Sequence, residues 1–112
     1  MVTENFTDIE QLVQGWLIKN KIPFESQVSL RGGAFELGGS KVDFIVGGNI
    51  AIRVQGGYWH SGVEKTGSDI VQRELLESDG WTVVDLFEED ILDYNRLEQA
   101  MKLAIQGQEM IR

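Results

Sequence analysis

Four polar residues with chemically useful side chains stand out in the stretch from residue 41 to residue 60, KVDFIVGGNIAIRVQGGYWH. Asp43 supplies a carboxylate, Arg53 a guanidinium, Gln55 an amide, and His60 is the only histidine of the chain. A carboxylate binds divalent cations, and cationic or amide groups bind phosphate oxygens. This stretch is therefore the first candidate for a site that holds a metal and a phosphate.

The same stretch predicts a β-hairpin. Two apolar runs, residues 42–46 and 50–55, flank a Gly-Gly-Asn loop that suits positive φ. Arg53 and Gln55 stand two apart on the returning strand, so their side chains share one face. Hairpin pairing can bring Asp43 near that polar face. The alternative is a plain ion pair between Asp43 and Arg53, and an arginine in that place is expected to lower the pKa of the carboxyl.

A capping box predicts the start of the first helix. Thr7 is the expected N-cap, and Glu10 follows three residues later. Apolar residues at helical spacing extend this helix to about Asn20, because Pro23 disfavours helix at the residue before it. Residues 24–30 then predict a strand. Its apolar face is expected to be formed by Phe24, Val28 and Leu30.

The second half of the chain predicts a helix, a strand and a further helix. The first of these spans about residues 68–78 and ends at Gly80, which suits a helix C-terminus. A β-branched strand follows at residues 81–86. Asn95 is the expected cap of the last helix, whose apolar face is formed by Leu97, Ala100, Met101 and Ala104.

The order of elements is α-β-β-β-α-β with an extra C-terminal helix, which predicts an α/β domain with a mixed central sheet flanked by helices. The helix between residues 50–55 and 81–86 makes a β-α-β crossover, so these two strands should be parallel and adjacent. Residues 34–37, between glycine pairs, predict a short strand or a loop. All 112 residues are expected to form one domain, residues 1–112.

Composition limits the classes of function. The net charge of −8 repels phosphates, so DNA binding requires basic residues gathered on one face or a metal ion between protein and phosphate. The absence of cysteine excludes disulfides and thiolate metal sites. No apolar run resembles a signal peptide or is long enough to cross a bilayer. We expect a cytoplasmic protein without a membrane partner.

Four motifs occur in order along the chain: VDF at residues 42–44, GGYWH at 56–60, Arg-x-x-Leu at 73–76 and Gly-Trp at 80–81. Together they resemble the PD-(D/E)xK nuclease superfamily, which has the restriction-endonuclease-like fold, and most closely its very-short-patch-repair endonuclease branch. The resemblance covers about residues 10–90, and the αβββαβ core of that fold matches the predicted order. It implies a DNA endonuclease of nicking, junction or repair type that depends on Mg²⁺ or Mn²⁺.

The resemblance also implies roles for single residues. Asp43 takes the place of the metal-binding aspartate. Arg53 stands where the superfamily has a glutamate and Gln55 where it has a lysine, so this motif is degenerate. The very-short-patch-repair branch itself lacks that glutamate and relies on its aspartate and on the histidine after the tryptophan, which is His60 here. Candidates for a replacement carboxylate ligand are Glu10, Glu36 and Asp69.

In the catalytic interpretation, Gln55 or His60 positions the attacking water and Arg53 stabilises charge on the phosphate. A domain of this size usually needs a second copy to cut both strands, so a homodimer is expected. One alternative is an inactive nuclease-fold module that binds DNA or serves in an assembly. Another is a dimeric protein-interaction domain without a nucleic-acid role. The residues expected to contact DNA are Arg53, Tyr58, Lys65 and Arg73.

Overall fold

The computed structural model describes residues 8–30, 40–55 and 67–110. The segment at residues 34–37, for which a short strand or a loop was expected, lies outside these ranges. No helix in the described ranges is long and apolar enough to span a membrane. The elements, in chain order, are α1 (Asp8–Lys19), β1 (Phe24–Leu30), β2 (Ser40–Val46), β3 (Ile50–Gln55), α2 (Gly67–Ser78), β4 (Thr82–Phe87), α3 (Glu88–Ile91) and α4 (Tyr94–Ala104).

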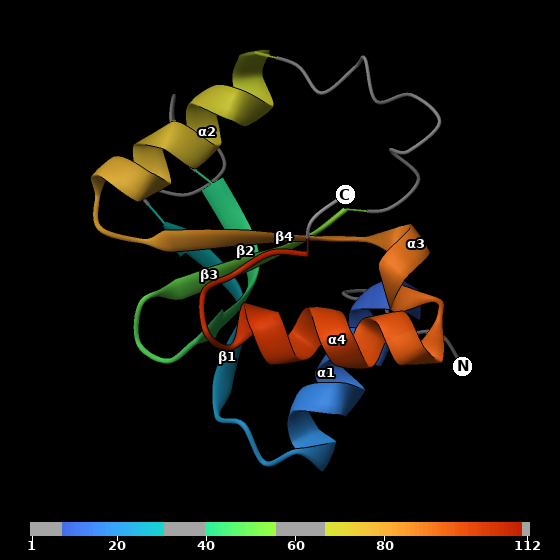
Figure 1. The fold of residues 1–112 in the computed structure, drawn as a ribbon. Helices are drawn as coiled ribbons and strands as arrows, with labels where there is room; N and C mark the ends of the chain where they lie inside the picture. The colour runs from blue at the N-terminus through green and yellow to red at the C-terminus, as the bar shows by residue number, and fades with distance from the viewer. Residues whose placement is uncertain (1–7, 31–39, 56–66, 111–112) are drawn as a thin grey trace.

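The four strands form one mixed sheet in the order β1-β2-β3-β4. β1, β2 and β3 pair antiparallel, whereas β3 and β4 pair parallel, with Ile52 opposite Val84. Figure 1 shows α2 on one side of the sheet and α1 with α4 on the other. The predicted α/β class and the β-α-β crossover are therefore confirmed.

Two apolar cores lie on the two faces of this sheet, and the side chains of β3 supply both by alternation. Ile52 faces α1 and α4, and Ala51 faces α2. Burial of each large side chain contributes roughly 1.5–3 kcal/mol, so packing on both faces holds the sheet in place. The α1-side core includes Val13, Leu17, Phe44, Ile52, Val84, Leu86 and Met101, and the α2-side core includes Val42, Ile45, Ala51, Leu76 and Val83.

Glycine conformations fit the predicted turns. Gly47 and Gly48, in the loop between β2 and β3, have φ of 62° and 88°, which most L-residues avoid. Gly80 follows α2 with φ of 97°, as expected for a helix C-terminus.

One predicted strand face is wrong. Phe24 packs against the α1-side core, whereas Val28 packs against the α2-side core. The cause is Gln27, a non-glycine residue with φ of 55°, which interrupts the alternation of β1. The alternation of the paired strand β2 is interrupted at the same level. Val42 lies in the α2-side core and Phe44, two residues later, lies in the α1-side core.

The start of the last helix also differs from the prediction. Asp93, not Asn95, is the N-cap, because its carboxylate accepts a hydrogen bond from the backbone N–H of Arg96 at 3.1 Å. The short helix α3 was not predicted, and it places Asp93 at the start of α4. The buried face of α4 is the predicted one.

Candidate functional site

Asp43 lies where strands β2 and β3 separate. The paired residues of these strands end at Phe44 and Ile52. Beyond that pair, the carboxylate of Asp43 accepts a hydrogen bond of 2.7 Å from the backbone N–H of Val54. A side chain thus satisfies a strand N–H that would otherwise bond to a neighbouring carbonyl, and the Asp43 carboxylate is fixed at the opening between the strands.

Glu10 of α1 meets this carboxylate. Burial raises the pKa of Asp43 to about 7; the Val54 N–H opposes the shift, and a hydrogen bond and charge repulsion from Glu10 add to it. The two carboxyl groups therefore lie within hydrogen-bonding reach, where both cannot carry a full charge at low cost. The expectation that Arg53 lowers the pKa of Asp43 is wrong, because the neighbour of Asp43 is an acid.

Gln27 is the third residue at this position. It lies between Ser26 and Val28, whose partners Phe44 and Val42 flank Asp43 on β2. Its amide favours the charged form of Asp43 and lowers the pKa of that carboxyl. Its Nε2 atom is nevertheless buried without a hydrogen bond of good geometry among the described residues. The Asp43, Glu10 and Gln27 side chains are called the carboxyl site below.

Arg53 pairs with the carboxylate of Asp85 and not with that of Asp43, the partner considered from the sequence. Its Nε and NH2 atoms donate to the two oxygens of Asp85 on β4 at 2.8 and 3.1 Å. The two residues are opposite each other in the parallel ladder and are 5% and 8% exposed. A fork of two hydrogen bonds is the strong geometry for an arginine and a carboxylate.

Three further side chains join this pair. Gln55 Nε2 donates to Asp85 Oδ1 at 3.1 Å, and Arg73 NH1 of α2 donates to Asp85 Oδ2 at 2.8 Å. Glu109, beyond α4, accepts from Arg73 NH1 at 2.9 Å and from the backbone N–H of Asp85 at 2.7 Å. Burial alone would raise the pKa of Asp85, but its hydrogen bonds and the charges of Arg53 and Arg73 outweigh burial and lower it. These five residues are called the Asp85 network.

The carboxyl site and the Asp85 network lie against different helices. Asp43 meets Glu10 on α1, whereas Arg53 meets Arg73 of α2 around Asp85. Figure 1 shows those helices on opposite sides of the sheet. The expected grouping of Asp43 with Arg53 and Gln55 on one polar face is therefore not what the contacts show.

Some of the predicted site residues cannot be placed. Glu36, Tyr58, His60 and Lys65 lie outside the described residues. Asp69 falls in the first turn of α2. Within residues 8–30, 40–55 and 67–110, no group of three or more acidic, histidine or cysteine residues is arranged to hold a metal ion. The carboxyl site brings together two acidic side chains, Asp43 and Glu10.

Sequence reasoning missed Asp85 and Gln27. Asp85 carried a usable signal, because an acid within the buried strand sequence TVVDLF requires a partner. Gln27 carried none, since a glutamine in a half-exposed strand is ordinary and its positive φ is a property of the folded backbone alone.

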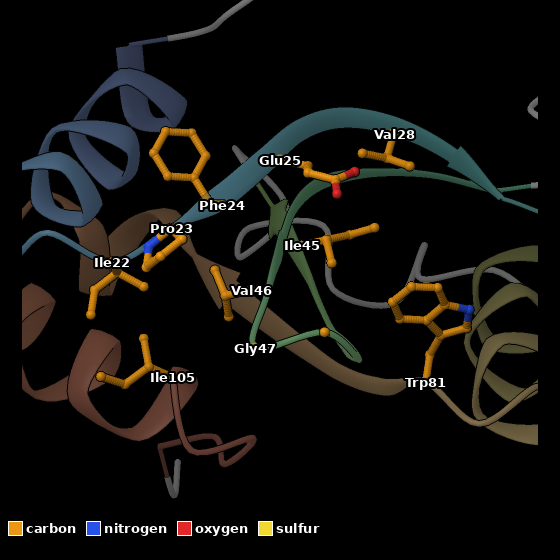
Figure 2. A pocket seen from close by; sticks show the side chains of 11 residues that line it. Ile22, Pro23, Phe24, Glu25, Val28, Ile45, Val46, Gly47, Trp81 and Ile105 are labelled. Atoms are coloured by element: carbon orange, nitrogen blue, oxygen red, sulfur yellow. The ribbon is translucent and has the colours of Figure 1, made fainter.

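A pocket of about 720 Å³ lies at the turn end of the β2–β3 hairpin. Figure 2 shows its apolar side chains around Gly47, with Glu25 as the charged residue among those labelled. Neither the carboxyl site nor the Asp85 network contributes to its lining. A mostly apolar pocket of this kind has few groups that bind a phosphate.

Comparison with known proteins gives a likeness of fold. No protein-family model and no curated protein matches the chain. Among solved structures, the chain is similar to the catalytic domain of the homing endonuclease I-Bth0305I, with a TM-score of 0.62 and 24% sequence identity. The match covers 87% of this chain and 92% of that domain. The fold of the chain is thus that of a known endonuclease domain.

Proposed function

We propose that the protein is a metal-dependent DNA endonuclease whose cation is held by Asp43 and Glu10. The observation that carries this proposal is the contact between these two carboxyl groups at the opening between β2 and β3. Two acids placed together in a partly buried position repel each other once both are charged. A cation between them removes that repulsion. The likeness to a homing endonuclease catalytic domain supports the same class of activity.

The residues present fit a hard cation. Both donors are carboxylate oxygens, which Mg²⁺ and Mn²⁺ prefer over nitrogen or sulfur. Mg²⁺ commonly takes only one or two carboxylates and completes its shell with water and substrate phosphate. Such an ion, when bound, supplies polarisation of the scissile phosphate and a water of lowered pKa.

The protein's own residues have separable tasks in this proposal. The Val54 N–H fixes the orientation of Asp43, and α1 brings Glu10 to it. Arg53 is almost fully buried and donates to Asp85, so we assign Arg53 and Gln55 to stabilising the sheet rather than to contacting phosphate. His60 stays the candidate for positioning the water, and Tyr58, Lys65 and Arg73 stay candidates for DNA contact.

The test is cleavage of supercoiled, linear and branched DNA with MgCl₂ or MnCl₂. We expect cleavage that needs the metal and falls to background in Asp43→Ala and Glu10→Gln. Glu74→Gln, which removes an exposed acid from α2, is the matched control and should cleave normally. Cleavage that persists in Asp43→Ala, or no cleavage of any of these DNAs with either metal, contradicts the proposal.

The second candidate is a nuclease-fold module without catalysis, which binds DNA or takes part in an assembly. The Asp85 network favours it, because Arg53 and Gln55 occupy the positions of the motif's glutamate and lysine and bond to Asp85 instead. This candidate predicts salt-sensitive DNA binding or a stable assembly without turnover. Turnover that depends on Asp43 excludes it.

A further inference from the structure

Gln27 combines two features that cost the fold free energy. Its φ of 55° lies in the left-handed region, which non-glycine residues occupy only when their surroundings hold them there. Within the described part of the chain, its Nε2 atom is buried without a hydrogen-bond partner of good geometry. A residue that is strained in its backbone and unsatisfied in its side chain is a candidate for a functional role.

The position of Gln27 indicates which role. It lies beside Asp43, between the pair of Ser26 with Phe44 and the pair of Val28 with Val42. At this level the side chains of both strands change from one face of the sheet to the other. The buried Nε2 atom has no surface for a direct contact with substrate. The acceptor within its reach is the Asp43 carboxylate, whose charged form its amide favours. Gln27 therefore acts through Asp43.

We infer that Gln27 is a positioning residue, whose amide donates to the Asp43 carboxylate when that carboxylate and Glu10 hold a divalent cation. The inference rests on the proposed function and deepens it. Among the described residues of the metal-free protein, the buried Nε2 atom of Gln27 has no hydrogen bond of good geometry, although the Asp43 carboxylate lies beside it. A cation held by Asp43 and Glu10 would orient the Asp43 carboxylate so that one oxygen accepts from Nε2. The unfavourable geometry of Gln27 is thus offset in the metal-bound state.

The test measures metal affinity and metal-free stability in the same variants. Gln27→Met keeps the volume but removes the donor, and Gln27→Gly relieves the backbone at φ of 55°. We expect either change to weaken Mn²⁺ binding by about tenfold or more, as measured by calorimetry, since partners of metal ligands have effects of this size. The melting temperature of the metal-free protein should stay level or rise, because an unsatisfied buried amide is removed. Ser26→Ala, at the exposed neighbouring position, is the control and should change neither value.

Combination with Asp43→Asn shows whether Gln27 acts through Asp43. Asp43→Asn alone should abolish Mn²⁺ binding, and adding Gln27→Met should have no further effect. An unchanged dissociation constant in Gln27→Met, or a weakening that follows a fall in stability, overturns the inference alone. A wild-type protein that binds no Mn²⁺, or binding that survives Asp43→Asn, overturns the metal site and the inference together.

Discussion

Arg53 and Asp85 lie opposite each other on the parallel strands β3 and β4 and are joined by two hydrogen bonds within the sheet. This pair explains why an arginine is compatible with the position where the superfamily that the sequence resembles carries a glutamate. An acid on β4 requires a base beside it, because an unpaired charge is costly to bury. The identities of residues 53 and 85 therefore depend on each other.

Asp85→Ala should destabilise the protein by about 3–5 kcal/mol, because it leaves the buried Arg53 guanidinium without its carboxylate. The measurement is urea unfolding of wild type and variant. The double change Arg53→Met with Asp85→Leu should recover most of the loss, since apolar residues of similar size replace a buried pair well. A loss below about 1 kcal/mol in Asp85→Ala would show that the pair is of little importance to stability.

Arg53→Glu, which introduces the glutamate of the motif that the sequence resembles, should lower the melting temperature more than Arg53→Gln does. The new carboxylate would lie directly beside Asp85, and like charges opposite each other in a sheet repel. Adding Asp85→Asn to Arg53→Glu should recover part of the loss. Equal melting temperatures for Arg53→Glu and Arg53→Gln would contradict this account.

The stability of the metal-free protein should depend on the pH through Asp43. Its pKa is about 7 in the folded protein against an ordinary value of 3.8, so the folded state holds more protons between these values. The free energy of unfolding contributed by this group therefore falls as the pH rises from about 4 to about 7 and is level above that. Denaturant unfolding in EDTA, compared with Asp43→Asn, isolates the effect. The gap in stability between Asp43→Asn and wild type should widen in favour of the variant as the pH rises.

Glu109→Ala should remove the hydrogen bond that protects the Asp85 backbone N–H at the outer edge of β4. The Glu109 carboxylate accepts from the Asp85 N–H, which faces away from β3 on a strand that ends the sheet. Loss of this hydrogen bond should speed hydrogen exchange of the Asp85 amide about tenfold, which corresponds to about 1.4 kcal/mol. Gln108→Ala, at the exposed neighbouring position, should leave that exchange rate unchanged. Equal exchange rates in the two variants would contradict the assignment.

Local patterns predicted most of the fold. Residues 50–55 form β3 with the predicted bounds, and Gly80 ends α2 as expected, because an apolar run and a helix-ending glycine act over a few residues. The predictions were wrong where a competing contact or an unusual backbone angle determines the local structure. Asp93 reaches the Arg96 N–H and displaces Asn95 as the cap. Gln27 reverses the alternation of β1 through one backbone angle.

The candidate site was predictable only in part. From the resemblance, Asp43 was expected to bind the metal, and Glu10 was one of three candidates for the second ligand. The structure brings the carboxyl groups of Asp43 and Glu10 together. The direction of Arg53 was not predictable, since two-residue spacing says which residues share a face but not which helix covers that face. The direction of the Arg53 side chain is determined by its hydrogen bond to Asp85 on β4, which is distant in the sequence.

The contact between Glu10 and Asp43 joins a helix to a strand that the helix reaches only through tertiary packing. A chain whose first helix has not packed on the sheet, or has come away from it, holds Asp43 without the second acid beside it. On the proposed function, such a copy is inert. On the same proposal, cleavage is confined to copies in which α1 packs on the sheet, and removal of α1 by proteolysis abolishes it.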